Sequence, residues 1–149
     1  MKTFSRTFHV RWADCDVNGH MRNTAYSEYA IDLRMAFLEH AGFPFERFSA
    51  LGLGPMLLRE EIDYVRELKL GDAMSVELRQ LGLSPDGIRF RFEHDFTRAD
   101  GKRAARIVIE GGWVDLRHRK LAAPPEELRH AFEALPKAEG WAELPSRRR

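Results

Sequence analysis

The stretch RWADCDVNGHMRNTAY, residues 11–26, places two aspartates around the single cysteine of the sequence and continues with Asn-Gly and a histidine. Upstream, over residues 4–12, apolar and polar side chains alternate, which is typical of a half-buried strand. Downstream, over residues 24–41, apolar side chains recur at helical spacing. The polar stretch is therefore predicted to be a loop that joins the end of a strand to the start of a long helix.

The expected helix is defined by an apolar stripe and by signals at both of its ends. The stripe consists of Tyr26, Tyr29, Ala30, Leu33, Phe37 and Ala41. Gly42 directly after the stripe, followed by Pro44, predicts where the helix stops. Asn23 or Thr24 is expected to cap its start, because either side chain accepts hydrogen bonds from N–H groups of the first turn.

Four extended runs follow a loop that contains LGLGP, residues 51–55. They cover residues 56–69, 73–81, 87–98 and 103–116, and short turns rich in Gly, Pro and Asp separate them. The third run alternates most clearly, with Ile88, Phe90, Phe92 and Phe96 on one face and Arg89, Arg91, Glu93 and Asp95 on the other. This pattern predicts an antiparallel sheet with one face in solvent. A short helix is expected over residues 123–135.

The order of strand, long helix, four strands and terminal helix predicts an α+β fold. The sheet is expected to pack around the long helix, because each has an apolar face that needs burial. Exposed edge strands are usually paired, so we expect a dimer with the sheet continuing across the interface. Gly111-Gly112 in the last run predicts a bulge or a close backbone approach, unless it is simply a weak spot in the strand.

Length and composition restrict the classes of protein. The 149 residues favour one domain, residues 1–149, and the net charge of +1 argues against general attraction to nucleic acid. No apolar run approaches the ~20 residues of a membrane span, and the first residues lack the apolar region of a secretion signal. We therefore expect a cytoplasmic protein with no membrane partner. Residues 144–149 are expected to form a flexible tail, with a phosphate- or partner-binding tail as the alternative.

Several common catalytic motifs are missing from the sequence. It has no phosphate-binding P-loop, no G-x-S-x-G nucleophile elbow and no H-E-x-x-H zinc motif. The six histidines show no paired spacing that suits a metal, so we expect a site without metal or bound cofactor. Cys15 is expected to be a packing thiol, although His20 nearby leaves a cysteine nucleophile open.

The polar loop offers a simpler chemistry. If Asp16 lies at the strand end and Asn23 at the helix start, a carboxylate faces free backbone N–H groups. These groups polarise a carbonyl placed over them, while the carboxylate attacks it or activates a water. Such an arrangement suits hydrolysis of an activated acyl group, for example a thioester. Asp16 equally fits a turn residue that accepts backbone hydrogen bonds near Gly19.

The same stretch resembles the 4-hydroxybenzoyl-CoA thioesterase family of hotdog-fold acyl-CoA thioesterases. RWADCDVNGHMRNTAYSEYAIDLR, residues 11–34, is similar to the family's D-x-D-x-x-G-H/I strand end and its N-x-x-Y helix start. IDYVRELKLGD and VDLRHRKLAAPPEELR extend the resemblance over nearly the whole chain. It implies a sheet wrapped around a central helix, a homodimer or homotetramer, and active sites at subunit interfaces.

Carried over residue by residue, the resemblance makes Asp16 the nucleophile or general base. It implies that backbone amides near Asn23 and Thr24 polarise the thioester, and that His20 and Tyr26 shape the pocket. His20 equally fits a packing histidine, and Tyr26 fits the core because it lies on the apolar stripe. The family commonly continues G-H with V-N-N, whereas Met21 and Arg22 stand here, so Arg22 either meets an anionic acyl group or faces solvent.

Other polar residues have expected roles as well. Asp14 is expected to be a structural hydrogen-bond acceptor, and Asn18 a turn residue. Glu28 lies off the apolar stripe and is expected to be solvated or to face an interface. Basic residues that either hold the phosphates of a CoA carrier or are ordinary surface are Arg59, Arg98, Lys102 and Arg103.

The sequence thus predicts an acyl-CoA thioesterase that cleaves a small or medium acyl-CoA to free acid and CoA. Two alternatives stay open. A thioesterase for acyl carrier protein needs a docking patch for the carrier, and a non-catalytic acyl-CoA binding module is compatible with the same fold.

Overall fold

The computed structural model describes residues 3–146 of the chain. Its elements follow in this order: β1 (Phe4–His9), the 3-10 turn η1 (Trp12–Asp14), α1 (Asn23–His40), α2 (Phe45–Leu51), β2 (Leu53–Tyr64), β3 (Ala73–Leu83), β4 (Arg89–Arg98), β5 (Arg103–Asp115), β6 (Lys120–Leu121) and α3 (Glu126–Glu133). Within residues 3–146, no helix is both long enough and apolar enough to cross a membrane.

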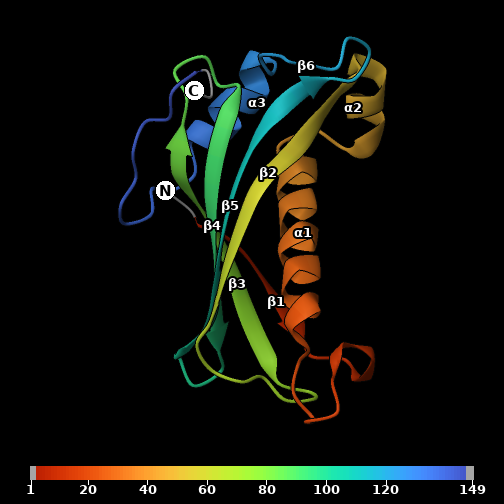
Figure 1. The fold of residues 1–149 in the computed structure, drawn as a ribbon, viewed down its shortest axis with the longest axis vertical. Coiled ribbons are helices and arrows are strands. Elements are labelled where there is room, and N and C mark those ends of the chain that lie inside the picture. Colours follow the sequence, from red (N-terminus) through yellow and green to blue (C-terminus); the bar gives the residue numbers. More distant parts are fainter. Residues whose placement is uncertain (1–2, 147–149) are drawn as a thin grey trace.

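The strands form one antiparallel sheet in the order β1-β3-β4-β5-β2, and β6 adds a short pairing to β5. The sheet curves around α1, which runs along its concave face (Figure 1). The helices α2 and α3 lie at one end of the molecule, and the loop before α1 lies at the other. The expected α+β arrangement, a sheet packed around a long helix, is present.

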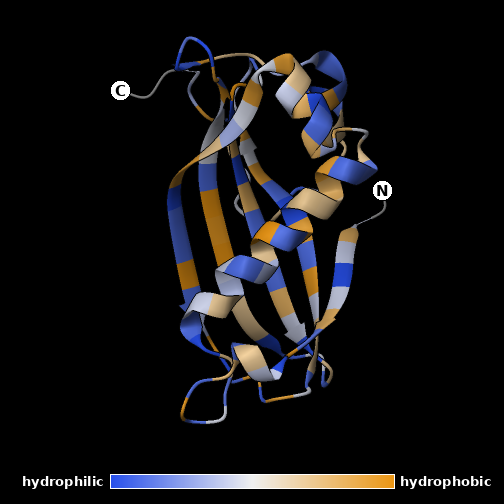
Figure 2. Ribbon diagram, turned by 90° about the vertical axis from the view of Figure 1, so that its right-hand side faces the viewer, coloured by the Kyte–Doolittle hydropathy of each residue, from blue (hydrophilic) through white to orange (hydrophobic). Residues whose placement is uncertain are grey.

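The core lies between α1 and the concave face of the sheet. The α1 side chains buried there are Ala25, Tyr26, Tyr29, Ala30, Leu33, Phe37 and Leu38. Hydrophobic and hydrophilic positions alternate along the strands beneath the helix, as Figure 2 shows. The predicted stripe of the helix is therefore its buried face, and Tyr26 and Tyr29 belong to the core, as their spacing predicts.

Three local predictions are wrong near the start of the chain. The first strand ends at His9, and the chain then turns, because the Arg11 guanidinium and main chain both bond to the Asp14 carboxylate. Trp12 is consequently 80% exposed rather than part of a strand face. The cap of α1 is Arg22, which makes no side-chain cap bond, so Asn23 and Thr24 lie inside the first turn.

The predicted loop around LGLGP is also wrong, because it is divided between two elements. Residues 45–51 form α2, which ends at Gly52 with a φ of 62°, and β2 already begins at Leu53. The left-handed conformation at Gly52 allows the helix to stop and the strand to start without a connecting loop. Pro55 lacks an N–H to donate to a neighbouring strand, and it is compatible with β2 because β2 lies at the edge of the sheet.

The predicted solvent face of β4 is only partly in solvent. Arg89 and Glu93 are buried, in contrast to the expectation. Arg89 pairs with Glu110 and also donates to the Pro145 carbonyl, whereas the Arg106 guanidinium bonds to Glu93 at 2.7 Å. Long arginine side chains and the C-terminal segment thus cover positions that the alternation of polar and apolar residues alone predicts to face solvent.

The segment after α3 completes the edge of β3 beyond its pairing with β1. Its anchor is Gln80, whose main chain bonds to Pro136 and Ala138 and whose side chain accepts from the Trp141 indole. Leu144 is buried and donates its N–H to the Leu83 carbonyl, so the expected flexible tail is wrong at residue 144. Residues 147–149 of that tail lie outside the described residues.

Gly111 confirms the predicted close backbone approach. A Cβ atom at this position would collide with the Met56 carbonyl oxygen of β2 and would lie 2.8 Å from the Phe90 ring of β4. On the β2 side, the register shifts between Leu57 and Arg59, which marks a bulge beside this glycine. The glycine therefore lets two neighbours press against β5 at one point.

Candidate functional site

The loop between η1 and α1 folds back on itself. Cys15 and Met21 form an isolated antiparallel bridge, and the Asp16 N–H donates to the His20 carbonyl at 2.9 Å. Gly19 closes the turn with a φ of 75° and donates to the Asp16 carbonyl at 3.1 Å. The Asn-Gly turn of the sequence thus places Asp16 next to the residues that lead into the helix.

Asp14 anchors this loop to the core. Its carboxylate is fully buried and accepts hydrogen bonds from the Arg11 main chain, the Arg11 guanidinium and the Tyr29 hydroxyl. Burial by itself would raise the pKa of Asp14, but the bonds from Arg11 and Tyr29 outweigh it and lower the pKa to about 2. Its carbonyl also accepts the Arg22 N–H at 2.7 Å. The structural role expected for Asp14 agrees with these contacts.

The Asp16 side chain is exposed, and its two oxygens differ. Oδ1 accepts the N–H groups of Asn18 at 2.8 Å and His20 at 3.3 Å, which is the turn role that the sequence allowed. Within residues 3–146, Oδ2 has no hydrogen-bond partner. The charge of Asp16 also acts on the Tyr26 ring, whose pKa is raised first by burial, then by Tyr64 and Asp16. One oxygen is thus fixed, and the other is free beside the first turn of α1.

At the start of α1, the N–H groups of Asn23 and Thr24 have no hydrogen-bond partner within residues 3–146, whereas that of Ala25 donates to the Arg22 carbonyl at 3.0 Å. Its cap residue Arg22 makes no side-chain cap bond; the guanidinium instead bonds to the Ala13 carbonyl at 2.7 Å and to Glu28 at 3.2 Å. Asn23 and Thr24 are exposed at this end. N–H groups in the first turn of a helix have no partner within the helix and carry partial positive charge. This end of α1 can therefore polarise a carbonyl oxygen that approaches from solvent.

His20 and Tyr26 flank the loop in different ways. The His20 imidazole pairs with Glu67 at 2.9 Å, which ties the loop to the segment between β2 and β3. The Tyr26 ring is buried and packs edge-to-face on Tyr64, with ring centroids 5.2 Å apart. The Tyr64 hydroxyl donates to the Asn23 carbonyl at 3.1 Å. The two tyrosines thus form a wall where the start of α1 meets the end of β2.

Arg59 is not brought to this loop. Its neighbour Glu60 accepts a hydrogen bond from Ser27 of α1, so the alternation of β2 turns Arg59 and Glu61 to the opposite, convex face. There, Arg59 pairs with Glu61 and lines a hollow together with Arg91 and Arg106. Because the sheet lies between them, Arg59 and the Asp16 loop face different sides of the molecule.

Several other candidates from the sequence are already engaged. Arg98 pairs with Asp100, and Arg103 pairs with Asp95 at 2.8 Å. The Cys15 thiol lies 3.5 Å from the Arg11 carbonyl, which fits a packing thiol. Within residues 3–146, no three His, Cys, Asp or Glu side chains gather in a way that could hold a metal ion.

A polar cluster under α1 is absent from the sequence-based predictions. The Arg34 guanidinium lies 3.1 Å from Nε2 of His94, and the latter is fully buried in β4. Nearby, the Ser27 hydroxyl donates to Glu60 at 2.7 Å. A signal was present, since His94 interrupts the apolar series of β4 at an inward position. Alternation alone does not indicate that Arg34 on the helix reaches it.

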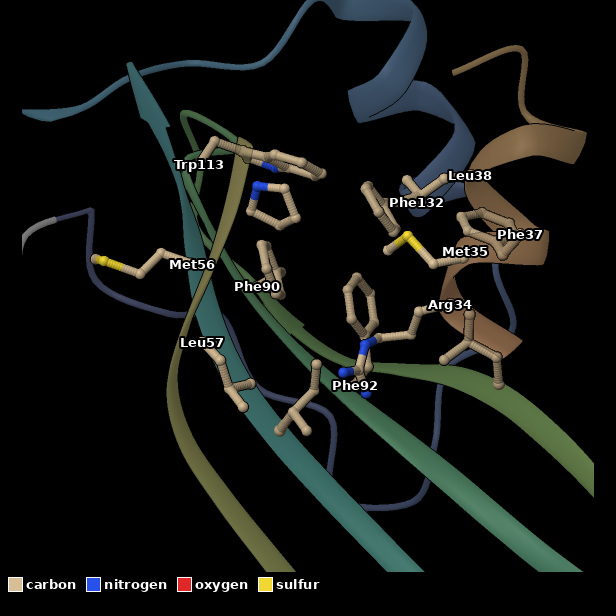
Figure 3. A pocket seen from close by; sticks show the side chains of 13 residues that line it. Arg34, Met35, Phe37, Leu38, Met56, Leu57, Phe90, Phe92, Trp113 and Phe132 are labelled. Atoms are coloured by element: carbon tan, nitrogen blue, oxygen red, sulfur yellow. The ribbon is translucent and has the colours of Figure 1, made fainter. Parts of the chain in front are cut away.

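A pocket of about 120 Å³ lies beside Arg34, between α1 and the sheet. Figure 3 shows the Arg34 side chain at its edge and a wall of aromatic rings opposite. These rings belong to Phe90, Phe92, Trp113 and Phe132, whereas Phe37 lines the pocket from α1 itself. This pocket lies toward the far end of α1 from the Asp16 loop.

A comparison with protein families matches residues 10–132 to the model of the thioesterase-like superfamily. The chain belongs to the thioesterase-like superfamily. This membership confirms the expectation of a thioester hydrolase and, with the curved sheet around α1, the hotdog fold. Membership in the narrower 4-hydroxybenzoyl-CoA thioesterase family stays a prediction. A comparison with curated proteins finds no significant match.

Solved structures support the fold of this superfamily member. A Staphylococcus aureus protein in complex with CoA has a TM-score of 0.83 at 24% identity, over 92% of this chain and 88% of that one. A 1,4-dihydroxy-2-naphthoyl-CoA thioesterase from Synechocystis has a TM-score of 0.80 at 20% identity, over 90% and 98%. A probable thioesterase from Escherichia coli has a TM-score of 0.75 at 24% identity, over 90% and 99%. At these identities the likeness shows the fold alone.

Proposed function

We propose that this thioesterase-like chain hydrolyses a small or medium acyl-CoA to the free acid and CoA. The observation that carries the proposal is the free Oδ2 of Asp16 beside the uncapped first turn of α1. A carboxylate and a set of backbone N–H donors are the two groups that hydrolysis of a thioester needs. Two structural neighbours, one in complex with CoA and one a 1,4-dihydroxy-2-naphthoyl-CoA thioesterase, favour CoA as the carrier.

In the proposed reaction, the thioester carbonyl oxygen lies against the N–H groups near Asn23 and Thr24. Oδ2 of Asp16 either attacks the carbonyl carbon or takes a proton from the attacking water. The N–H groups stabilise the negative charge on oxygen in the tetrahedral intermediate, and the CoA thiolate then leaves. Where Asp16 is the nucleophile, water then hydrolyses the Asp16–acyl anhydride to release the free acid and restore the carboxylate. His20 and Tyr26 fix the walls of the site through Glu67 and Tyr64. No metal or bound cofactor takes part in this proposal.

The first experiment compares the wild type with Asp16→Asn and measures CoA release from short, medium and aromatic acyl-CoAs. Asparagine preserves the size of the side chain and removes its charge, so we expect kcat to fall roughly 100-fold or more. Asn18→Ala is a matched control in the same turn and is expected to retain most of the activity. Equal rates for wild type and Asp16→Asn would remove Asp16 from the mechanism.

The two roles of Asp16 differ in where solvent oxygen goes. With enzyme in excess over acyl-CoA in ¹⁸O-water, label in the Asp16 carboxylate identifies a nucleophile whose acyl anhydride is opened at the Asp16 carbonyl, whereas a general base leaves the label in the released acid alone. Mass spectrometry of the peptide that contains Asp16 distinguishes the two.

The carrier is tested by comparing acyl-CoA with the same acyl group on acyl carrier protein. Binding of acyl-CoA without turnover would favour the non-catalytic module.

We further propose that the protein is a homodimer or homotetramer in the cytoplasm. β2 is a 12-residue edge strand, and exposed apolar side chains lie on it and on the neighbouring surface of α1. These are Met56 and Leu57 of β2 and Ile31 and Met35 of α1. A second copy that pairs with β2 would cover both the open edge and these side chains.

A further inference from the structure

The seam between α1 and β2 connects the Asp16 loop to the aromatic pocket. At the loop end, Tyr64 of β2 bonds to the Asn23 carbonyl of α1. Farther along, Ser27 of α1 bonds to Glu60 of β2, and Arg34 then leads into the pocket. Asn23, Ser27 and Arg34 are spaced by four and seven residues, so they share one face of the helix. Arg34 therefore lies at the far end of the helix face that begins beside the Asp16 loop.

Arg34 enters this pocket with unused donor capacity. The guanidinium has five N–H groups, and among residues 3–146 its one hydrogen-bond acceptor is His94 Nε2, 3.1 Å away. Burial lowers the pKa of Arg34 to about 10, and the charge of Glu60 opposes this shift. The side chain is therefore still positively charged at neutral pH. An apolar pocket with a charged donor on its edge favours a ligand that carries an acceptor there.

His94 is held as a fixed acceptor for Arg34. Its Nδ1 lies 3.3 Å from the Ile107 carbonyl, which only accepts, so Nδ1 carries the hydrogen and Nε2 offers its lone pair. Burial and the charge of Arg34 lower the pKa of His94 to about 3, so the ring is neutral. The ring thus orients one nitrogen of the guanidinium and leaves the others for the pocket.

The charge balance of the cluster indicates what kind of acceptor fits. Arg34 supplies one positive charge, Glu60 acts on it as one negative charge, and His94 is neutral. A ligand carboxylate would add a second negative charge near Glu60 in a poorly solvated place. A hydroxyl or carbonyl oxygen accepts from Arg34 without this cost.

The length of α1 limits the size of the ligand. Eleven residues separate Asn23 from Arg34, which corresponds to about 16 Å along the helix axis. The Arg34 side chain tilts back toward the helix start and shortens this span by a few Å. At roughly 1.2 Å per bond of an extended chain, the gap takes roughly eight to thirteen carbons. A single aromatic ring at the thioester would not reach Arg34.

We propose that the pocket beside Arg34 binds the distal end of a medium-length acyl chain, and that Arg34 selects chains with a neutral oxygen at that end. This inference rests on the proposed acyl-CoA thioesterase function. The pocket volume of about 120 Å³ suits the last carbons of such a chain.

The test uses decanoyl-CoA, ω-hydroxydecanoyl-CoA and decanedioyl-CoA with the full-length protein. We expect kcat/KM of the wild type to be roughly 10- to 100-fold higher for the ω-hydroxy substrate than for decanoyl-CoA, and lowest for the dioyl substrate. In Arg34→Met the preference for the hydroxyl should disappear, and Arg34→Lys should restore part of it. Arg79→Met, on the convex face, is the matched control and should retain the wild-type preference.

Equal kcat/KM for the first two substrates, or a preference for decanedioyl-CoA, would overturn the assignment. This comparison uses the wild type alone, so it does not depend on whether a variant folds. A second readout does not depend on catalysis. Calorimetry with free ω-hydroxydecanoate and decanoate should show the same preference in the wild type and its loss in Arg34→Met. If this preference is found without hydrolysis of any acyl-CoA, the pocket assignment stands and the proposed function fails. If neither acid is preferred, the assignment fails.

Discussion

Asp14 and Asp16 are two residues apart, but their surroundings give them different tasks. Asp14 is buried and bonded to Arg11 and Tyr29, whereas Asp16 is exposed with one oxygen free. Burial, followed by the bond to Asp14, raises the pKa of Tyr29 to about 12, so its hydroxyl keeps its proton as a donor. The first aspartate thus holds the loop so that the second can react.

The lowered pKa of Asp14 predicts a specific pH dependence of stability. Its pKa is about 2 in the folded protein and 3.8 in the unfolded chain. A depressed pKa stabilises the fold above the unfolded value, and this contribution is lost as pH falls from about 4 to 2. Asp14→Asn should therefore lower the free energy of unfolding by about 2 kcal/mol at pH 7, with a smaller difference from the wild type at pH 3.

Urea unfolding at the two pH values measures this difference. Asp100 and Asp115 also have lowered pKa values, from bonds to Arg98 and His118, but they contribute equally in both proteins. A difference between wild type and variant that does not change with pH would contradict the role assigned to the Asp14 charge.

Among the elements, β5 depends on a close contact that only glycine permits. An added Cβ at Gly111 would meet the main chain of β2 and the Phe90 ring, and neither can move without disturbing the sheet. We expect Gly111→Ala to lower the free energy of unfolding by about 1–3 kcal/mol. Gly54→Ala on β2 is the control, since its Cβ would meet only Leu116 side-chain atoms at 3.5 Å. Equal thermal midpoints for the two variants would refute the contact.

The sequence predicts elements well where periodicity is long and poorly where single contacts decide. The stripe of α1 and the alternation of β3, β4 and β5 are enough to place these elements. The turn at η1 depends on the bonds between Arg11 and Asp14, and the start of β2 depends on the left-handed Gly52. Neither of these features has a periodic signal.

In the candidate site too, some features could be predicted from the sequence and others depend on contacts that the sequence does not reveal. Its loop follows from the Asn-Gly turn and from the strand and helix on either side, so Asp16 and Asn23 could be expected near one another. The cluster of Arg34, His94 and Glu60 joins three elements that are far apart in sequence. Its members meet only because the sheet curves around α1, which local patterns do not describe.

At the scale of the whole molecule, the open edge of β2 predicts association. We expect the wild type to have the mass of two or four chains in light scattering. Ile31→Lys combined with Leu57→Lys should shift it toward the monomer, because both side chains are about half exposed on the proposed interface. Leu121→Lys on β6 is the control with a similarly exposed leucine and should keep the wild-type mass. A monomeric wild type would contradict the proposed assembly.

The closure of β3 by the last part of the chain has a consequence for biosynthesis. Gln80 and Leu83 bond to residues beyond α3, and Gly82 leaves room for the Ala142 carbonyl to approach. The ribosome makes β3 well before it makes this partner, so a nascent chain presents an unpaired strand edge until its C-terminal residues emerge. Premature termination after α3 would therefore produce an aggregation-prone protein, even though all residues of the Asp16 loop and of α1 are present.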